Sequence, residues 1–110
     1  MKKERRRARV RSFRRPKEIY HPVYRTMIDR LVRARRRKQF TQKDVAHAMG
    51  AGRQWVSKIE LCEVRLDVIS FLRMCRLYKI PATGLVRWME KEVARIGRLF
   101  FRYRILSVVD

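Results

Sequence analysis

The spacing of apolar residues restricts this chain to a small stack of short helices. Apolar side chains recur at steps of three and four residues in five segments, and helix-starting or helix-breaking residues separate the segments. His21-Pro22 opens the first segment, because proline is favoured in the first turn of a helix. Gly50-Ala51-Gly52 separates the second segment from the third. The pattern predicts an all-α fold of five helices.

Individual residues set the expected helix ends. A helix of roughly 16 residues should follow His21, and its last turn, Arg35 to Lys38, is wholly cationic. Thr41 is a good N-cap with Asp44 in the first turn, so the next helices should cover residues 42–49 and 53–60. Asp67 should cap the fourth helix, whose apolar positions repeat at helical spacing. Those positions are Val68, Phe71, Leu72, Cys75 and Tyr78.

The last segment has a clear start and an open end. We expect a helix from near Gly84 or Leu85 to about residue 98. Beyond it, Phe101, Tyr103 and Ile105 alternate with arginines, which is the period of a strand, so the conformation of residues 97–110 stays open.

The charge points to a polyanionic partner. The 110 residues include 30 Lys and Arg against 10 Asp and Glu, a net charge of +20. Residues 1–17 hold ten basic side chains and one acid, so that segment carries +9 and the rest +11. Arginine, which bonds phosphate bidentately, outnumbers lysine 22 to 8. Nucleic acid is therefore the expected partner, and an acidic membrane surface is the weaker alternative.

Several classes of function are excluded by what the chain lacks. Its two cysteines lie 13 positions apart without a CxxC pair, and there are only two histidines, so neither a zinc site nor a disulfide scaffold is expected. No apolar run has transmembrane length. The nucleophile, base and acid candidates form no plausible triad, so we expect no enzyme, no metal and no cofactor. The reducing cytoplasm, at the nucleoid, is the expected location.

Residues 40–60 have the pattern of a helix-turn-helix. Ala46 is small where two helices would cross, and Gly50 stands where a left-handed residue ends the first helix. Val56 and Ile59 should pack back on that helix. The opposite face of the second helix is then free, and it offers Arg53, Gln54, Trp55, Ser57 and Lys58.

These residues resemble the lambda-repressor-like helix-turn-helix family, the Cro or xenobiotic-response-element (XRE) type. The likeness covers about residues 31–80. It includes Arg35, Thr41-Gln42, Val45-Ala46, Gly50, the run VSKIE at 56–60, Leu66-Asp67 and Phe71-Leu72. The resemblance implies five helices, with the helix at 53–60 in the major groove. Gln39 and Cys62 stand where the family usually has glycine, so both turns should carry some strain.

The resemblance also implies roles for single residues. Arg53, Gln54, Trp55 and Ser57 would read bases, with Arg53 suited to guanine and Gln54 to adenine. Gln42, Lys43 and Lys58 would bind phosphate. Charge alone, and not the resemblance, assigns phosphate contacts to Arg5, Arg6 and Arg7 of the basic arm. Arg35 and Glu60 would form a structural pair. Trp55 is large for this face, and packing against the following loop is an equal alternative.

The chain divides into three expected parts. Residues 1–18 form a basic arm that contacts nucleic acid or serves solubility, 19–84 form the DNA-binding domain, and 85–110 form a dimerisation element. The dimer seam would be Leu85, Met89, Val93, Ile96 and Phe100, although the same residues could instead cap the core of one chain.

The function that follows is a sequence-specific DNA-binding transcription regulator. A repressor that binds an inverted repeat as a homodimer fits best. An antitoxin that neutralises a toxin partner and represses its own operon is one alternative. A charge-driven nucleic-acid-binding protein without sequence preference is another.

Overall fold

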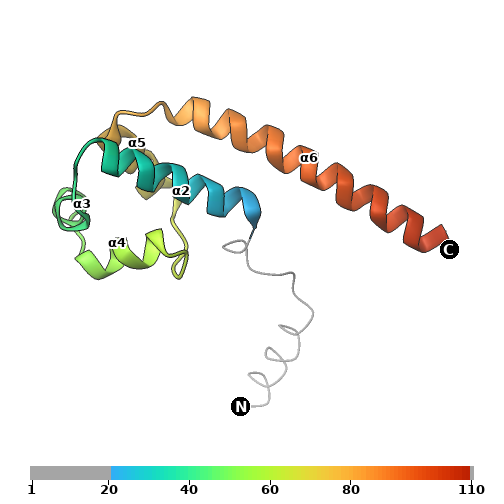
Figure 1. Cartoon of the computed structure of the whole chain (residues 1–110), viewed down its shortest axis with the longest axis horizontal. Coiled ribbons are helices and arrows are strands. Elements are labelled where there is room, and N and C mark those ends of the chain that lie inside the picture. Colours follow the sequence, from blue (N-terminus) through green and yellow to red (C-terminus); the bar gives the residue numbers. More distant parts are fainter. Residues whose placement is uncertain (1–20, 110) are drawn as a thin grey trace, which may run out of the picture.

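The computed structural model describes residues 21–109, with side chains from 21 to 99. This part of the chain is all helical (Figure 1). The helices are α2 (Pro22–Arg37), α3 (Gln42–Met49), α4 (Arg53–Glu60), α5 (Val68–Tyr78) and α6 (Ala82–Val109). The all-α fold of five helices predicted from the sequence is confirmed.

The helices begin where their capping residues predict. The Thr41 hydroxyl accepts a hydrogen bond from the Asp44 amide at 3.0 Å, and the Asp44 carboxylate accepts one from the Thr41 amide at 2.8 Å. This capping box satisfies two amides that the first turn of α3 leaves without helical partners. Asp67 caps α5 through the Ser70 amide at 2.8 Å. His21 caps α2, because its side chain accepts a hydrogen bond from the Val23 amide at 3.1 Å.

The core lies between α2 and the helices that it contacts, α4, α5 and α6, while α3 packs against α4 and α5. Its most buried large side chains are Ile28, Val45, Val56, Ile59, Met74, Cys75 and Tyr78. Ala46 is 4% exposed at the crossing of α3 and α4, as its small size predicted. The Tyr24 hydroxyl accepts a hydrogen bond from the Leu66 amide at 2.9 Å, which ties the loop before α5 to α2.

Two of the apolar positions that repeat along α5 are not buried. Val68 is 71% exposed and Leu72 is 45% exposed. The helix buries a single narrow stripe, made of Phe71, Met74, Cys75 and Tyr78. Helical spacing alone cannot show how wide a stripe the neighbouring helices cover.

Helix α6 begins at Ala82, slightly before the predicted start, and runs to Val109. The alternating residues after position 100 therefore belong to a helix and not to a strand. Figure 1 shows α6 leaving the body as a long arm. Leu85 is buried and Trp88 and Met89 pack on the core, whereas Val93 is 49% and Leu99 is 55% exposed.

Among residues 21–109, three residues other than glycine adopt the left-handed conformation. Gln39 has φ 61°, Cys62 has φ 59° and Lys79 has φ 56°. The first two are the turn positions where the sequence predicted strain, and the third follows α5 directly. Gly50, at φ 68°, ends α3 as predicted. A side chain in this conformation costs about 1 kcal/mol relative to glycine.

Candidate nucleic-acid interface

A buried ion pair joins the end of α2 to the end of α4. The Arg35 guanidinium donates to both carboxylate oxygens of Glu60, at 2.7 and 3.1 Å. Its remaining nitrogen donates to the Phe40 carbonyl at 2.8 Å. The two side chains are only 10% and 11% exposed. The structure thus makes the pair that the family resemblance implied.

Gln42 extends this pair to the first residue of α4. Its amide nitrogen donates to Glu60 at 2.8 Å, and its amide oxygen accepts from Arg53 at 3.4 Å. A continuous polar chain therefore runs from buried Arg35, through Glu60 and Gln42, to the exposed Arg53. Such a chain limits the positions that the Arg53 guanidinium can take before any partner arrives.

The outer face of α4 presents fewer free side chains than predicted. Arg53, Gln54 and Lys58 are exposed, while Ser57 is half-buried. Trp55 is also half-buried and packs against the core. Part of the Trp55 ring stays accessible, so its contact with a base remains a prediction. Val56 and Ile59 hold the inner face, at 0% and 1% exposure.

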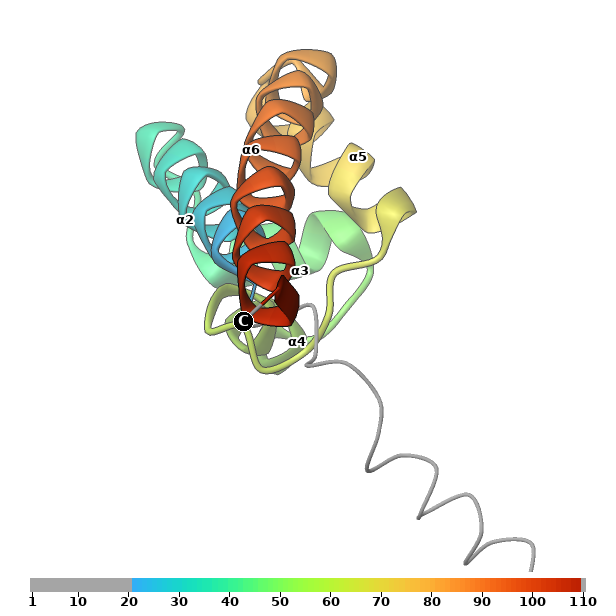
Figure 2. The ribbon, with the colours of Figure 1, turned by 90° about the vertical axis from the view of Figure 1, so that its right-hand side faces the viewer.

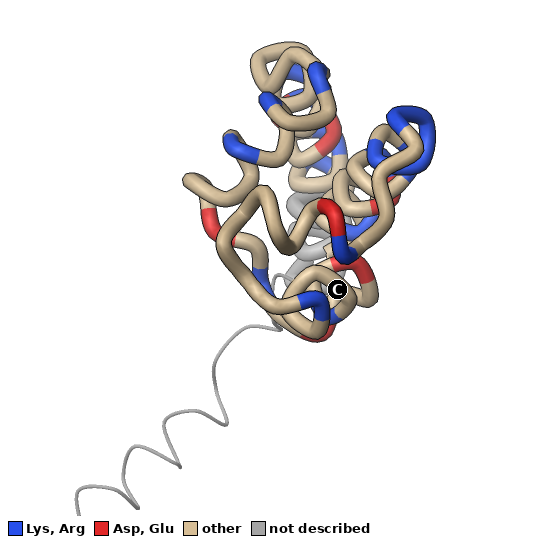
Figure 3. Tube along the Cα trace, turned by 90° about the vertical axis from the view of Figure 1, so that its left-hand side faces the viewer, with Lys and Arg blue, Asp and Glu red and all other residues tan. Residues whose placement is uncertain are grey.

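The charge is distributed unevenly over the described helices. Residues 41–63, which we name the α3–α4 unit, hold three basic and three acidic side chains and so have no net charge. Residues 21–38, the α2 segment, hold seven basic side chains and one acid. The longest continuous run of basic positions in Figure 3 is the end of this segment. The net charge of each expected helix, counted from the sequence, could have revealed that the α2 segment is strongly basic in addition to residues 1–17.

The ionisable groups near α4 have structural roles. Burial, with the Glu60 carboxylate as a smaller cause, raises the pKa of Tyr78 to about 12, so its hydroxyl stays neutral. The backbone hydrogen bond from Thr41 holds the pKa of Asp44 below its usual value. Within residues 21–109 no cluster of ligand side chains could hold a metal ion, and none of the helices could cross a membrane.

The other predicted site residues fall into two groups. Lys43 is exposed on α3, and Gln42 is half-buried in the polar chain. Of the predicted dimer seam, Leu85 belongs to the chain's own core, Met89 packs on that core, Ile96 is half-buried and Val93 is exposed. Arg5, Arg6, Arg7 and the Phe100 side chain lie outside the described residues.

One solved structure matches this chain closely enough to identify its family. No protein-family model matches, and a search of curated proteins finds no match. The XRE-family like protein from Pseudomonas syringae pv. tomato str. DC3000 aligns with a TM-score of 0.61 and 35% sequence identity. The alignment covers 67% of this chain and 90% of that one. With its helix-turn-helix geometry, this chain belongs to the XRE family.

Proposed function

We propose that this protein is a sequence-specific transcription regulator that inserts α4 into the major groove of DNA. Membership of the XRE family supports a DNA-binding regulator of the helix-turn-helix type in general. The observation that carries the finer proposal is the polar chain from Arg35 to Arg53. It holds the first exposed residue of α4 in place, as base reading requires.

Base reading would come from Arg53 and Gln54. Arg53 suits the two acceptors of guanine and Gln54 suits adenine, and each such pair discriminates by about 1–3 kcal/mol. Ser57 is half-buried, so we expect at most one contact to DNA from it, through its hydroxyl group. Trp55 packs partly on the core, so only the exposed part of its ring would contact DNA, at the edge of the α4 face.

Phosphate contacts would come from the two ends of the α3–α4 unit. Lys43 and Lys58 are exposed. The Gln42 amide nitrogen has a second hydrogen, which remains available for phosphate after the bond to Glu60. The basic arm, with Arg5, Arg6 and Arg7, would add contacts without sequence preference.

The regulator would act as a homodimer on an inverted repeat, most simply as a repressor. Helix α6 extends past the body with Val93 49% exposed, and a second copy of α6 would cover this side chain. The seam would consist of Met89, Val93, Ile96 and Phe100, without Leu85. A dimer would place two copies of α4 on successive turns of the duplex.

The charge distribution supports a second candidate, a binder of any nucleic acid. The α3–α4 unit has no net charge, whereas the α2 segment and residues 1–17 are strongly basic. A protein that binds by charge alone would not need the exposed α4 face. It would bind scrambled DNA and RNA as tightly as a selected duplex.

In vitro selection on random duplex DNA separates the two candidates. The proposal expects a recurring palindromic site, and selection without any recurring motif would contradict it. A salt titration on the selected site then measures the phosphate contacts. Removal of residues 1–17 should weaken binding to all sequences and flatten the salt dependence, because phosphate contacts are lost and base contacts are kept.

A further inference from the structure

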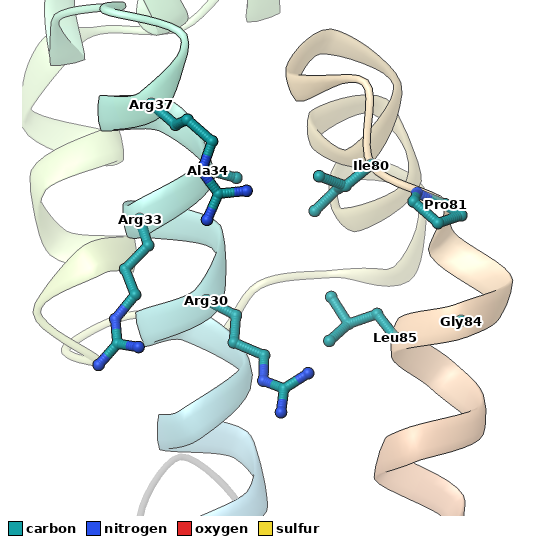
Figure 4. Close-up of a pocket in the computed structure, with 8 residues that line it drawn as sticks. All are labelled: Arg30, Arg33, Ala34, Arg37, Ile80, Pro81, Gly84 and Leu85. Carbon is teal, nitrogen blue, oxygen red and sulfur yellow. The ribbon is translucent and has the colours of Figure 1, made fainter.

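A groove lies between α2 and the start of α6. It measures about 450 Å³ and is lined by Arg30, Arg33, Ala34, Arg37, Ile80, Pro81, Gly84 and Leu85 (Figure 4). This volume is within the range of small-molecule sites. In both Figure 1 and Figure 2 the start of α6 and helix α4 lie at opposite ends of the body. The groove is therefore separate from the proposed DNA interface.

The two walls of the groove differ in chemistry. Arginines of α2 form one wall, and Ile80, Pro81 and Leu85 form the other. Figure 4 shows the side chains of Arg30 and Arg37 reaching into the space between the walls, while Arg33 turns away from it. None of the eight lining residues is acidic. The groove thus combines positive charge with an apolar surface and has no carboxylate of its own.

The arginines differ in what already holds them. Arg33 pairs with Asp29 at 3.0 Å. The Arg30 guanidinium stacks on the Trp88 ring, 4.0 Å from its centroid, which fixes its position and leaves its edge free to donate. No side chain of the described residues forms an ion pair with Arg37. Arg37 is thus directed at an apolar wall, and no carboxylate of residues 21–99 pairs with it.

The position of Arg37 on α2 explains why it faces the groove. Successive helix residues turn by about 100°, so Arg37 points almost opposite to Arg35, two residues earlier. Arg35 is directed at Glu60 of α4. A basic last turn stabilises a helix, but that effect does not require an apolar surface opposite the charge.

We propose that this groove binds a small organic anion, in which an apolar body carries a carboxylate, sulfonate or phosphate group. The anionic group would accept paired hydrogen bonds from Arg37, and the apolar body would lie on Ile80, Pro81 and Leu85. The phosphates of DNA are joined by sugars, which offer much less apolar surface to that wall than an aromatic or aliphatic body. An ion such as sulfate would leave it uncovered as well.

The probe for the test is anilinonaphthalene sulfonate, whose aromatic body carries one sulfonate and whose fluorescence rises on binding. Its affinity for the full chain is compared with those for Arg37→Gln and Gly84→Leu. A Cβ at Gly84 would meet Pro81 at an ordinary 3.7 Å, so a leucine there fills the groove without a clash at its Cβ. Arg36→Gln removes the same charge outside the groove, and Gly97→Leu adds the same side chain to α6 in open space.

The proposal expects Arg37→Gln and Gly84→Leu to weaken binding roughly tenfold or more, and both controls to stay within about twofold. Uncharged anilinonaphthalene should bind the unaltered protein roughly tenfold more weakly than the sulfonate. Equal losses in Arg36→Gln and Arg37→Gln would reduce the effect to net charge and overturn the proposal. Circular dichroism checks that each variant folds. If Gly84→Leu does not fold, Arg37→Gln still tests the proposal, because Arg37 is exposed and its replacement should not disturb the fold.

Discussion

The α3–α4 unit and the α2 segment are neighbours in the fold, but they differ in net charge and in how their charged side chains are bonded. The unit is neutral, and two of its charged residues, Arg53 and Glu60, are bonded within the polar chain. The α2 segment carries an excess of six positive charges, and only Arg35 points into that chain. Among the described residues, the most basic segment is therefore not the helix that we propose to read DNA.

The largest expected effect comes from breaking the link between the two regions. Glu60→Ala would leave Arg35 buried without a partner and Gln42 without its acceptor. Loss of one partner of a buried pair costs about 3–5 kcal/mol, a large part of the stability of a small domain. Urea unfolding measures the change. Glu63→Ala, an exposed acid of the same unit, should change the free energy of unfolding by less than about 0.5 kcal/mol.

The next effect concerns α6, which would bring two α3–α4 units together. Val93→Glu should weaken the dimer roughly a hundredfold, because it places two like charges at the seam. Light scattering during gel filtration measures the mass across a range of concentrations. Val68→Glu, at the more exposed apolar position on α5, is the matched control. Dissociation by Val68→Glu and not by Val93→Glu would move the interface to α5.

A smaller loss of stability is expected in acid. It should arise at α3 and α5, where carboxylates cap the helices, and not at α2. The N-caps of α3 and α5 use the carboxylates of Asp44 and Asp67, whereas α2 is capped by His21. Backbone hydrogen bonds from Thr41 and Ser70 lower the pKa of Asp44 and Asp67, respectively. The two carboxylates therefore contribute to folding stability at pH values above their unfolded-state pKa, about 4. This stability is lost as the pH falls through the lower pKa of the folded state.

Thermal melts between about pH 5 and pH 2 measure this loss. The double variant Asp44→Asn, Asp67→Asn should be less stable at pH 5 and lose less stability than the parent on acidification. If both proteins lost stability in parallel, the two carboxylates would not be the groups that titrate.

The smallest effect is at the turn between the two regions. Gln39 is exposed at φ 61°, so Gln39→Gly should stabilise the protein by up to about 1 kcal/mol. Cys62 has the same backbone conformation but is 8% exposed. Cys62→Gly removes a buried side chain as well as the strain, so its gain should be smaller or reversed. Equal gains at both positions would show that burial of Cys62 contributes nothing.

The helices were predictable because local signals set their ends. Pro22, Thr41, Gly50 and Asp67 act on the backbone within one turn, and the bounds of α3 and α4 match the prediction. The exposure of Val68 and Leu72 could not be predicted from their spacing, because it depends on how much of α5 its neighbours cover. The end of α6 was left open because alternation over a few residues does not reveal a helix that continues from an earlier segment.

The candidate site was predictable only in part. The family pattern identified Arg35, Glu60 and Gln42, but the single chain of bonds that joins them to Arg53 required the structure. Trp55 faced outward in the pattern, and only tertiary packing shows that its ring is half-covered. The groove beside Arg37 has no local signal, because its walls come from α2 and from residues more than 40 positions later.

The most direct test of α4 as the reading helix is the ratio of affinities for a selected duplex and a scrambled one. Arg53→Ala should reduce this ratio by about 1–3 kcal/mol, because one base contact is lost. Arg37→Ala removes the same charge from the α2 segment, on the side away from α4, and should leave the ratio unchanged. Equal reductions in the two variants, or none in Arg53→Ala, would contradict the assignment of sequence reading to α4.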